Sequence, residues 1–239
     1  MKLLFFTYLL LIPFMYADYT DHPDSKKIMQ ELVEIHGFEK SYVEDVFKNA
    51  IKQQKIIDSI SKPAEFTWTW ERYKKLFIED KRIRNGKKFI KQNIDTLNRA
   101  EQEFGVPKEI IVSILGVETR YGKIMGSYRV IDSLTTLGFD YPRRSAFFKD
   151  ELIKFFLLTR ENNLDIYSIK GSYAGAMGYG QFISSSYRAY AVDFDGDNKA
   201  DLFNSVDDAI GSIANYLKVH GWKKNGKIVT KSIPNNVRE

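Results

Sequence analysis

Glu118 continues the apolar face of a predicted helix. Four aliphatic residues precede it at helical spacing: Ile110, Ile111, Ile114 and Leu115. A carboxylate therefore occupies the next core-facing position, where burial raises its pKa. Gly122 indicates the helix C-terminus shortly downstream, and the negative end of the helix raises that pKa further. A carboxyl group that stays protonated near neutral pH can donate a proton in catalysis; the alternative is a last-turn glutamate that points to water.

Cleavage of a glycosidic bond usually needs such an acid together with a second carboxylate. Asp132 and Asp140 follow Glu118 in the chain, but the start of a helix explains Asp132, and a turn before Pro142 explains Asp140. If Glu118 acts alone, it must serve first as acid and then as base, while the substrate supplies the nucleophile.

Residues 171–182 alternate Gly and Ala with larger side chains, a pattern that lets the backbone approach a ligand closely. The larger residues include Ser172, Tyr173, Met177, Tyr179 and Gln181. Met177 and Tyr179 can supply apolar faces, while Ser172 and Gln181 can orient hydroxyl or amide groups. The alternative is a tight packing loop between helices, and the even interleaving favours a ligand groove.

An acidic segment near the end of the chain has the spacing of a metal loop. Asp193, Asp195 and Asp197 stand at positions one, three and five of a calcium loop, and Lys199 at position seven would offer its backbone carbonyl. The alternative is a metal-free acidic turn. A cation is preferred because three alternating carboxylates would otherwise repel one another.

The match to an EF-hand is incomplete. Position six is Asn198 where Gly is expected, and position twelve is Asn204 where a bidentate Glu is expected. A strict EF-hand is therefore excluded, and a longer loop must close on a carboxylate in the first turn of the next helix. We assign Asp208 to that place, with Asp207 as the alternative.

The first half of the chain is predicted to be a helical scaffold, because the residue pattern from Asp24 to Gly105 is helical and strongly charged. Ser41 and Glu44 predict a capping box. A helical run is predicted from Gly86 to Phe104, with Gly105 as its stop. Between the helices, Trp68, Trp70 and Tyr73 follow Lys62-Pro63 in a predicted extended segment, where they fill the core or, alternatively, form a sugar-stacking wall.

The second half is also predicted to be helical, without an alternating strand pattern. Pro107 starts the helix that carries Glu118, and a shorter helix runs from Val130 to Leu137 and ends at Gly138. Pro142 starts the next helix, whose buried face contains Phe148, Leu152, Phe155 and Phe156. The last predicted helix runs through Ile210 and Leu217 to Gly221.

Composition sets further limits. The 239 residues, 44% hydrophobic and 28% charged, suit one compact domain or two closely packed ones. A net charge of +5 favours anionic surroundings, but no basic run with interleaved aromatic residues predicts a nucleic-acid partner. The absence of Cys excludes disulfides, thiol catalysis, Cys-ligated zinc and a lipid on an N-terminal Cys.

Residues 1–17 are predicted to be a secretory signal peptide. Lys2 precedes an apolar stretch that Pro13 interrupts and that is shorter than the roughly 20 residues of a membrane-spanning helix. If the segment is not removed, loose association with the inner membrane is expected.

Together these segments resemble the lytic murein transglycosylases of the membrane-bound B type, in glycoside hydrolase family 103. The similarity runs from about Pro63 to Trp222. It is densest in five motifs: GVETRYG around Glu118, LGFDYPRR from Leu137, GSYAGAMGYGQF from Gly171, VDFDGDNKADL from Val192 and DAIGSIANYL from Asp208. Several motifs in the same order make the resemblance specific.

The resemblance implies a mainly α fold. A lysozyme-like catalytic core with a calcium loop is expected over residues 105–222, an N-terminal helical region over 18–104 and a basic tail over 223–239. It implies a periplasmic monomer that binds peptidoglycan glycan strands and cleaves the β-1,4 bond between N-acetylmuramic acid and N-acetylglucosamine. The product carries a 1,6-anhydro ring, and no organic cofactor is expected.

The resemblance also implies roles for particular residues. Glu118 is the sole acid and base, Ser172, Met177 and Gln181 contact the sugar or its acetamido group, and Tyr216 lines the groove. The Asp193 loop binds a structural Ca²⁺. The chain departs from the family at Ser184, where Pro is usual, a change expected to be harmless, and nothing after Trp222 matches the Arg-Tyr-Asn motif of a C-terminal segment that helps form the groove. That departure motivates one alternative, a non-catalytic peptidoglycan-binding protein, and the nearest enzyme alternative is a hydrolase of the same polymer.

Overall fold

The fold is known from a computed structural model, which describes residues 18–62 and 68–229. The predicted signal peptide, Pro63 and the last ten residues of the predicted tail lie outside the described residues. The elements run in this order: η1 (Tyr19–Asp21), α1 (Pro23–Glu34), α2 (Lys40–Asn49), α3 (Gln54–Ser61), α4 (Trp70–Phe77), α5 (Asp80–Gln92), α6 (Ile94–Phe104), α7 (Lys108–Thr119), β1 (Tyr128–Arg129), α8 (Val130–Asp140), η3 (Pro142–Arg144), α9 (Ser145–Glu161), β2 (Lys170–Gly171), α10 (Ser184–Tyr190) and α11 (Val206–Val219).

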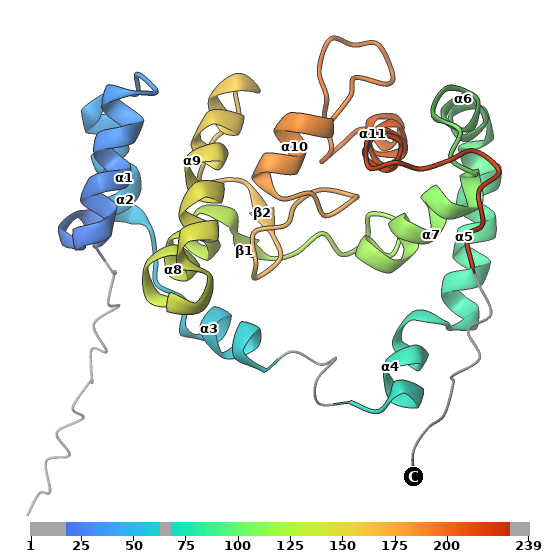
Figure 1. Cartoon of the computed structure of the whole chain (residues 1–239), viewed down its shortest axis with the longest axis horizontal. Coiled ribbons are helices and arrows are strands. Elements are labelled where there is room, and N and C mark those ends of the chain that lie inside the picture. The colour runs from blue at the N-terminus through green and yellow to red at the C-terminus, as the bar shows by residue number, and fades with distance from the viewer. Residues whose placement is uncertain (1–17, 63–67, 230–239) are drawn as a thin grey trace, which may run out of the picture.

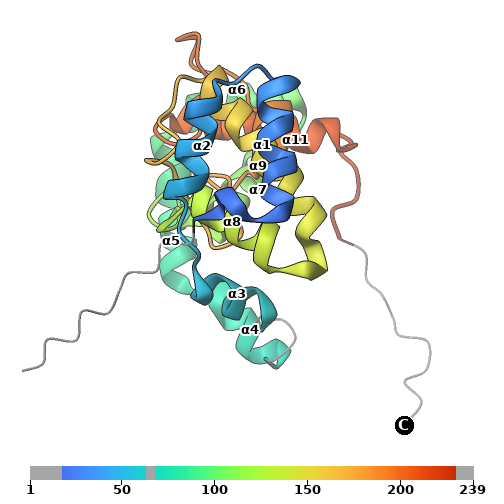
Figure 2. The ribbon, with the colours of Figure 1, turned by 90° about the vertical axis from the view of Figure 1, so that its left-hand side faces the viewer.

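Most of the helices lie side by side in a row (Figure 1). The α1–α2 pair lies at one end and α5 with α6 at the other, while α8 to α11 fill the space between them (Figures 1 and 2). Neighbouring helices pack as α8 on α9, α9 on α10, α11 on α6 and α7, and α5 on α7. The mainly helical prediction is therefore confirmed.

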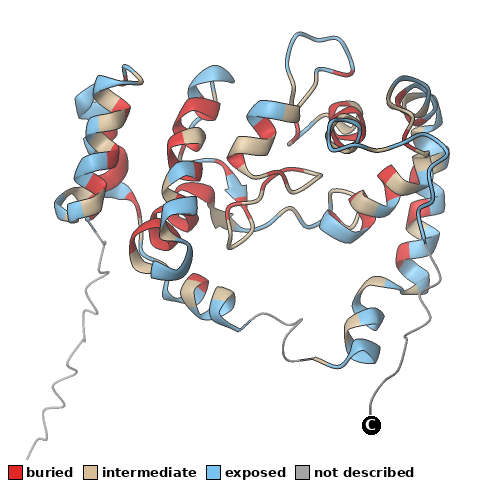
Figure 3. Ribbon diagram, in the orientation of Figure 1, coloured by how far each residue is buried: buried red, intermediate tan, exposed pale blue. Residues whose placement is uncertain are grey.

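The largest part of the core lies along α8 and α9 (Figure 3). Phe148, Leu152, Phe155 and Phe156 of α9 are all buried, so the predicted apolar face is confirmed. Phe156 packs on Phe47 of α2, with ring centroids 5.9 Å apart. The N-terminal helices are thus joined to the later ones by aromatic packing.

Two predicted helix boundaries were wrong. Gly138 does not end a helix, since α8 continues to Asp140. A Cβ built on Gly138 would lie 3.5 to 3.7 Å from Lys149 and Phe148 of α9, which is ordinary van der Waals contact. The run from Gly86 to Phe104 is two helices, separated at Asn93, whose φ is −123° and ψ is 30°.

The predicted capping box was also wrong. Helix α2 begins at Lys40 with Glu39 as its N-cap residue, and no side chain caps it. Val43 donates its N–H to the carbonyl of Glu39 at 3.1 Å, so Ser41 already lies inside the helix. Gly105, by contrast, is confirmed as the stop of α6, with a φ of 73°.

Ser184 stands where the family usually has proline, and the structure permits a test of that difference. Ser184 is the first residue of α10 and fully buried, and its hydroxyl has no hydrogen-bond partner among the described residues. Ile183 before it is extended, with φ −76° and ψ 165°, as proline requires of its predecessor. Ser184→Pro is expected to raise the melting temperature by about 2–4 °C, measured by circular dichroism.

The matched control is Ser185→Pro. The Ser185 N–H donates to Oε2 of buried Glu151 at 2.9 Å, and proline would remove that donor. The control is expected to lower the melting temperature; equal effects of the two substitutions would contradict the assignment.

Candidate active site

Glu118 lies at the edge of a cavity and not in the core. Ile111 and Leu115 of α7 are fully buried, whereas Glu118 near the C-terminal end of the helix is exposed. The cavity has a volume of about 410 Å³. Its walls come from α7, the 180–186 segment and α11: Ile114, Glu118, Gly180, Gln181, Phe182, Ile183, Ser186, Ile213, Tyr216 and Leu217. The expectation of a core-facing carboxylate is corrected to a cavity-facing one.

The predicted rise of the Glu118 pKa is confirmed. Of the two causes expected, burial and the helix C-terminus, the structure gives burial. Partial burial among apolar side chains raises the pKa of the Glu118 carboxyl above its ordinary value. Among the described residues, no hydrogen bond or ion pair to this carboxyl offsets that effect. A larger fraction of Glu118 is therefore protonated at mildly acidic pH, as a proton donor requires.

A left-handed corner follows Glu118. Helix α7 ends at Thr119, three residues before the predicted stop, and Arg120, Tyr121 and Gly122 have φ values of 52°, 64° and 81°. The Tyr121 hydroxyl donates to the carbonyl of Arg82 at 2.8 Å, and Arg120 pairs with Glu79 at 2.9 Å. The corner is thus held by Arg82 of α5 and by Glu79, the residue before α5.

Thr119 joins the corner to the small-residue segment. Its buried hydroxyl accepts the N–H of Gly122 at 2.9 Å and donates to the carbonyl of Tyr179 at 2.8 Å. A Cβ at Gly122 would lie only 1.9 Å from the Tyr179 ring, so the two segments meet in close contact. Sequence reasoning missed Thr119, whose only signal was its place beside Glu118.

Only Gln181 of the five residues proposed from the 171–182 segment lines the cavity with Glu118. It has a φ of 51°, and its side-chain amide donates to the carbonyls of Met125 and Gly178 at 3.1 and 3.0 Å. Tyr173 and Tyr179 are half-buried beside the core.

Ser172 and Met177 do not line the cavity. The Ser172 hydroxyl accepts the N–H groups of Ala174 and Ala176 at 3.3 and 3.1 Å, so it organises its own turn. Met177 is fully buried and exchanges backbone hydrogen bonds with Phe182. It supports the cavity wall from behind.

Tyr216, predicted from α11, does line the cavity. Its ring packs edge-on against Phe182, with centroids 5.8 Å apart, and His220 stacks on it at 4.0 Å. Ile213 and Leu217 lie on the same side of α11 and were missed as wall residues, although their helical spacing around Tyr216 was a usable signal. Phe182, Ile183 and Ser186 were missed because their segment showed no periodic pattern.

The two other carboxylates considered as catalytic partners are engaged elsewhere. Asp132 is buried, accepts the Ile51 N–H at 2.9 Å and pairs with Arg129. Asp140 accepts the Tyr19 hydroxyl at 2.7 Å and pairs with Lys52. Both tie the N-terminal helices to α8, which leaves Glu118 as the carboxyl group in the cavity.

The acidic loop has an arrangement that can hold a metal ion. One oxygen from each of Asp193, Asp195 and Asp197 lies within 4.8 Å of the others, and all three residues are exposed. Hard carboxylate oxygens suit Ca²⁺. The Lys199 side chain is exposed, and the Lys199 backbone N–H donates to Oδ1 of Asp197 at 2.9 Å.

Asp208 does not join this cluster. It is fully buried and accepts backbone N–H groups from Phe194, Asp195 and Asp201 at 2.7, 3.2 and 2.8 Å. Burial raises its pKa despite these bonds. The assignment of Asp208 as a ligand is replaced by a role in shaping the loop, while Asp207 accepts the Thr96 hydroxyl at 2.6 Å.

Comparison with known proteins identifies relatives of this chain. The chain is 43% identical over 221 residues to membrane-bound lytic murein transglycosylase B of Escherichia coli, covering 89% of this chain and 61% of that protein. The chain thus spans about three fifths of the length of this curated relative.

Solved structures of lytic transglycosylases are also similar to the chain. Soluble lytic transglycosylase SltB1 of Pseudomonas aeruginosa is 49% identical with a TM-score of 0.82, over 86% of this chain and 69% of that one. Slt35 of E. coli, solved in complex with calcium, is 43% identical with a TM-score of 0.82, over 89% and 68%. SltB3 of P. aeruginosa, 30% identical with a TM-score of 0.76 over 84% and 54%, was solved in complex with NAG-NAM-pentapeptide.

The fold is therefore the lysozyme-like helical fold of Slt35, with one carboxyl group at the edge of a cavity. The profile of the Transglycosylase SLT domain matches residues 21–238. The chain belongs to the Transglycosylase SLT domain family. None of the helices within residues 18–62 and 68–229 is long and apolar enough to cross a membrane.

Proposed function

We propose that this protein is a lytic transglycosylase that cleaves the β-1,4 bond between N-acetylmuramic acid and N-acetylglucosamine in peptidoglycan. The observation that carries the proposal is Glu118, a carboxyl group with a raised pKa that faces a cavity together with Gln181 and Tyr216. Relatives that act on murein, and one solved with a peptidoglycan fragment, support the substrate class.

The chemistry uses Glu118 twice. The protonated carboxyl group gives its proton to the glycosidic oxygen, and the C1–O bond breaks as the N-acetylglucosamine hydroxyl leaves. The resulting carboxylate removes the proton from the C6 hydroxyl of the muramoyl residue while that oxygen bonds to C1. A 1,6-anhydro ring forms, water is not consumed, and Glu118 is protonated again.

The other groups hold the sugar. The Gln181 amide is fixed by two carbonyls, so its orientation at the cavity wall is set before substrate binds. The Tyr216 ring offers an apolar face, and Ser172, Tyr173 and Tyr179 are proposed to contact the sugar along the same segment. Met177 acts through the wall it supports, because it is fully buried.

Product mass tests the reaction. Isolated peptidoglycan sacculi are digested with the purified chain, and the soluble muropeptides are analysed by mass spectrometry. Anhydro products, one water lighter than hydrolysis products, are expected. Reducing ends would show a hydrolase instead, and binding without release of muropeptides would show a non-catalytic binding protein.

We also propose that Asp193, Asp195 and Asp197 bind a structural Ca²⁺, with the Lys199 carbonyl as a further ligand. The cluster geometry and the calcium complex of Slt35 support this proposal. The ion would neutralise three exposed carboxylates and would take no part in the reaction.

Calcium binding predicts a measurable stabilisation. Calcium at about 100 times its dissociation constant is expected to raise the melting temperature by roughly 5–10 °C. Asp195→Ala is expected to abolish the rise, whereas Asp58→Ala on α3, an exposed position outside the loop, should keep it. A rise that survives in Asp195→Ala would place the ion elsewhere.

The predicted signal peptide and a cell-wall substrate together support a periplasmic location, and we propose that the chain acts there as a monomer. Secretion of a fusion of residues 1–17 to a reporter enzyme tests the location.

A further inference from the structure

A cluster of rings surrounds Tyr216 near the end of α11. His220, one turn further along the chain, stacks on the Tyr216 ring with centroids 4.0 Å apart and 24° between the ring planes. Tyr190, the last residue of α10, meets both rings edge-on, at 5.2 Å from Tyr216 and 4.9 Å from His220. Phe182 approaches Tyr216 in the same way at 5.8 Å. Three neighbours therefore contact the ring that α11 contributes to the Glu118 cavity.

The His220 ring is itself held by a hydrogen bond. Its Nδ1 lies 2.7 Å from the backbone carbonyl oxygen of Tyr216. A carbonyl oxygen accepts hydrogen bonds and cannot donate them, so Nδ1 carries the hydrogen atom of this bond. The backbone N–H of His220 donates to the same oxygen at 3.0 Å. The imidazole ring therefore cannot turn away from Tyr216 without breaking a hydrogen bond.

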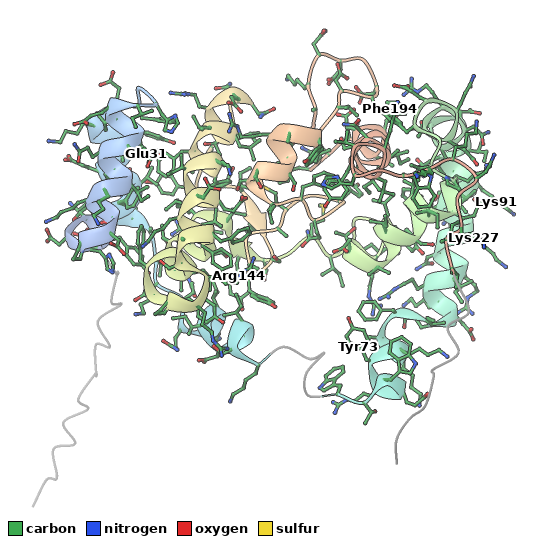
Figure 4. All side chains as sticks on the ribbon, in the orientation of Figure 1. Glu31, Tyr73, Lys91, Arg144, Phe194 and Lys227 are labelled. Carbon is green, nitrogen blue, oxygen red and sulfur yellow. The ribbon has the colours of Figure 1, made fainter. Side chains whose placement is uncertain are left out.

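The backbone that carries these rings is anchored. Phe194 lies beside α11 (Figure 4), and a Cβ at Gly211 of that helix would lie only 2.4 Å from the Phe194 ring. The side-chain amide of Asn215 donates to the carbonyl of Tyr190 at 2.9 Å, which joins the end of α10 to α11. The freedom that remains is rotation of the Tyr216 side chain, and the stacked His220 ring opposes that rotation.

His220 is neither a core residue nor a wall residue of the Glu118 cavity. It is exposed, so its contact with Tyr216 is not needed to fill the core. It lines a neighbouring hollow of about 620 Å³, and Ser186 is the residue that lines both this hollow and the cavity. His220 therefore stands behind the cavity wall, where its ring contacts Tyr216 from outside.

We propose that His220 is a positioning residue for substrate binding: it covers one face of the Tyr216 ring and holds the other face ready for the sugar. The inference rests on the proposed function, in which Tyr216 contacts the sugar. A ring already held in its bound orientation avoids the entropy cost of being ordered when substrate binds. The effect falls on KM and not on kcat, because His220 takes no part in the proton transfers of Glu118.

Steady-state kinetics on soluble peptidoglycan strands test this role. His220→Ala is expected to raise KM about 2- to 10-fold, the cost of ordering one side chain, with kcat unchanged. His220→Phe keeps a planar ring and should restore most of the wild-type KM, whereas His220→Gln keeps a hydrogen-bond donor without a ring and should resemble His220→Ala. Val219→Ala, an exposed neighbour outside the ring cluster, is the matched control and should behave like the wild type. The melting temperatures should agree within about 2 °C, because both positions are exposed.

Three results would overturn the proposal. An unchanged KM in His220→Ala would show that the stack does not matter for binding. A loss confined to kcat would place His220 in the chemistry. Rescue by His220→Gln and not by His220→Phe would assign the effect to the hydrogen bond in place of the ring.

A binding measurement separates this inference from the proposed reaction. Calorimetry compares the binding of the same strands by Glu118→Gln with and without His220→Ala, and the double variant should bind about 2- to 10-fold more weakly. If the wild type leaves reducing ends or does not cleave, the proposed reaction is wrong, while this difference in binding persists. Equal binding by the two proteins overturns the inference whatever the reaction is. If neither protein binds the strands, the sugar site and the inference are both wrong.

Discussion

Glu118→Gln is expected to lose nearly all release of muropeptides from sacculi. The amide cannot give a proton to the glycosidic oxygen or take one from the C6 hydroxyl, and each lost proton transfer costs about 10²–10⁴-fold in rate. Glu109→Gln, an exposed glutamate on the same helix, is the matched control and should keep its activity. Substantial activity in Glu118→Gln would remove Glu118 from the mechanism.

The raised pKa of Glu118 makes the same variant informative about stability. The folded protein favours the protonated carboxyl, so the wild type loses stability as the pH rises through the raised pKa. At neutral pH the Gln variant should therefore melt at a higher temperature than the wild type. The difference should close as the pH falls below the ordinary pKa of glutamic acid. Wild-type activity should fall from mildly acidic to alkaline pH, because the first step needs the protonated form.

Asp208→Ala is expected to cause the largest loss of stability. Removing this buried side chain leaves the N–H groups of Phe194, Asp195 and Asp201 without their acceptor, at a cost of roughly 3–5 kcal/mol. The melting temperature should fall by about 10 °C. Asp207→Ala, which removes an acceptor for the Thr96 hydroxyl, should lose much less.

A chelator separates this role from that of a metal ligand. If Asp208 shapes the loop through its hydrogen bonds, the loss of stability persists in excess EDTA. If Asp208 binds calcium, the difference between wild type and Asp208→Ala should largely disappear in EDTA.

Helical periodicity in the sequence was sufficient to predict the long helices, because their burial repeats along one face. The buried face of α9, with Phe148, Leu152, Phe155 and Phe156, is the clearest case. Helix ends were predicted less well, since packing with distant residues decides them. Gly138 lies inside α8, where a Cβ would make only ordinary contact with α9, and Gly86 lies inside α5, where the Tyr121 side chain packs closely on it.

The site was predicted in part. Gln181 and Tyr216 lie with Glu118, but periodicity could not distinguish a position that faces the core from one that faces a cavity. Met177 was assigned to the sugar from its motif and Asp208 to the metal from its place after the loop, whereas their burial depends on contacts from far along the chain. The wall residues from Phe182 to Ser186 have no local pattern, so only the folded chain brings them to the cavity.

The contacts of the corner after Glu118 explain why residues 119–122 can be retained in evolution without selection for catalysis. Thr119, Arg120, Tyr121 and Gly122 each have a structural contact: a carbonyl of the neighbouring segment, the Glu79 carboxylate, a carbonyl of α5 and the ring of Tyr179. Natural selection for a stable fold would retain all four in a descendant that had lost its activity. Among these neighbouring residues, the identity of residue 118 alone would then record whether selection for catalysis continues.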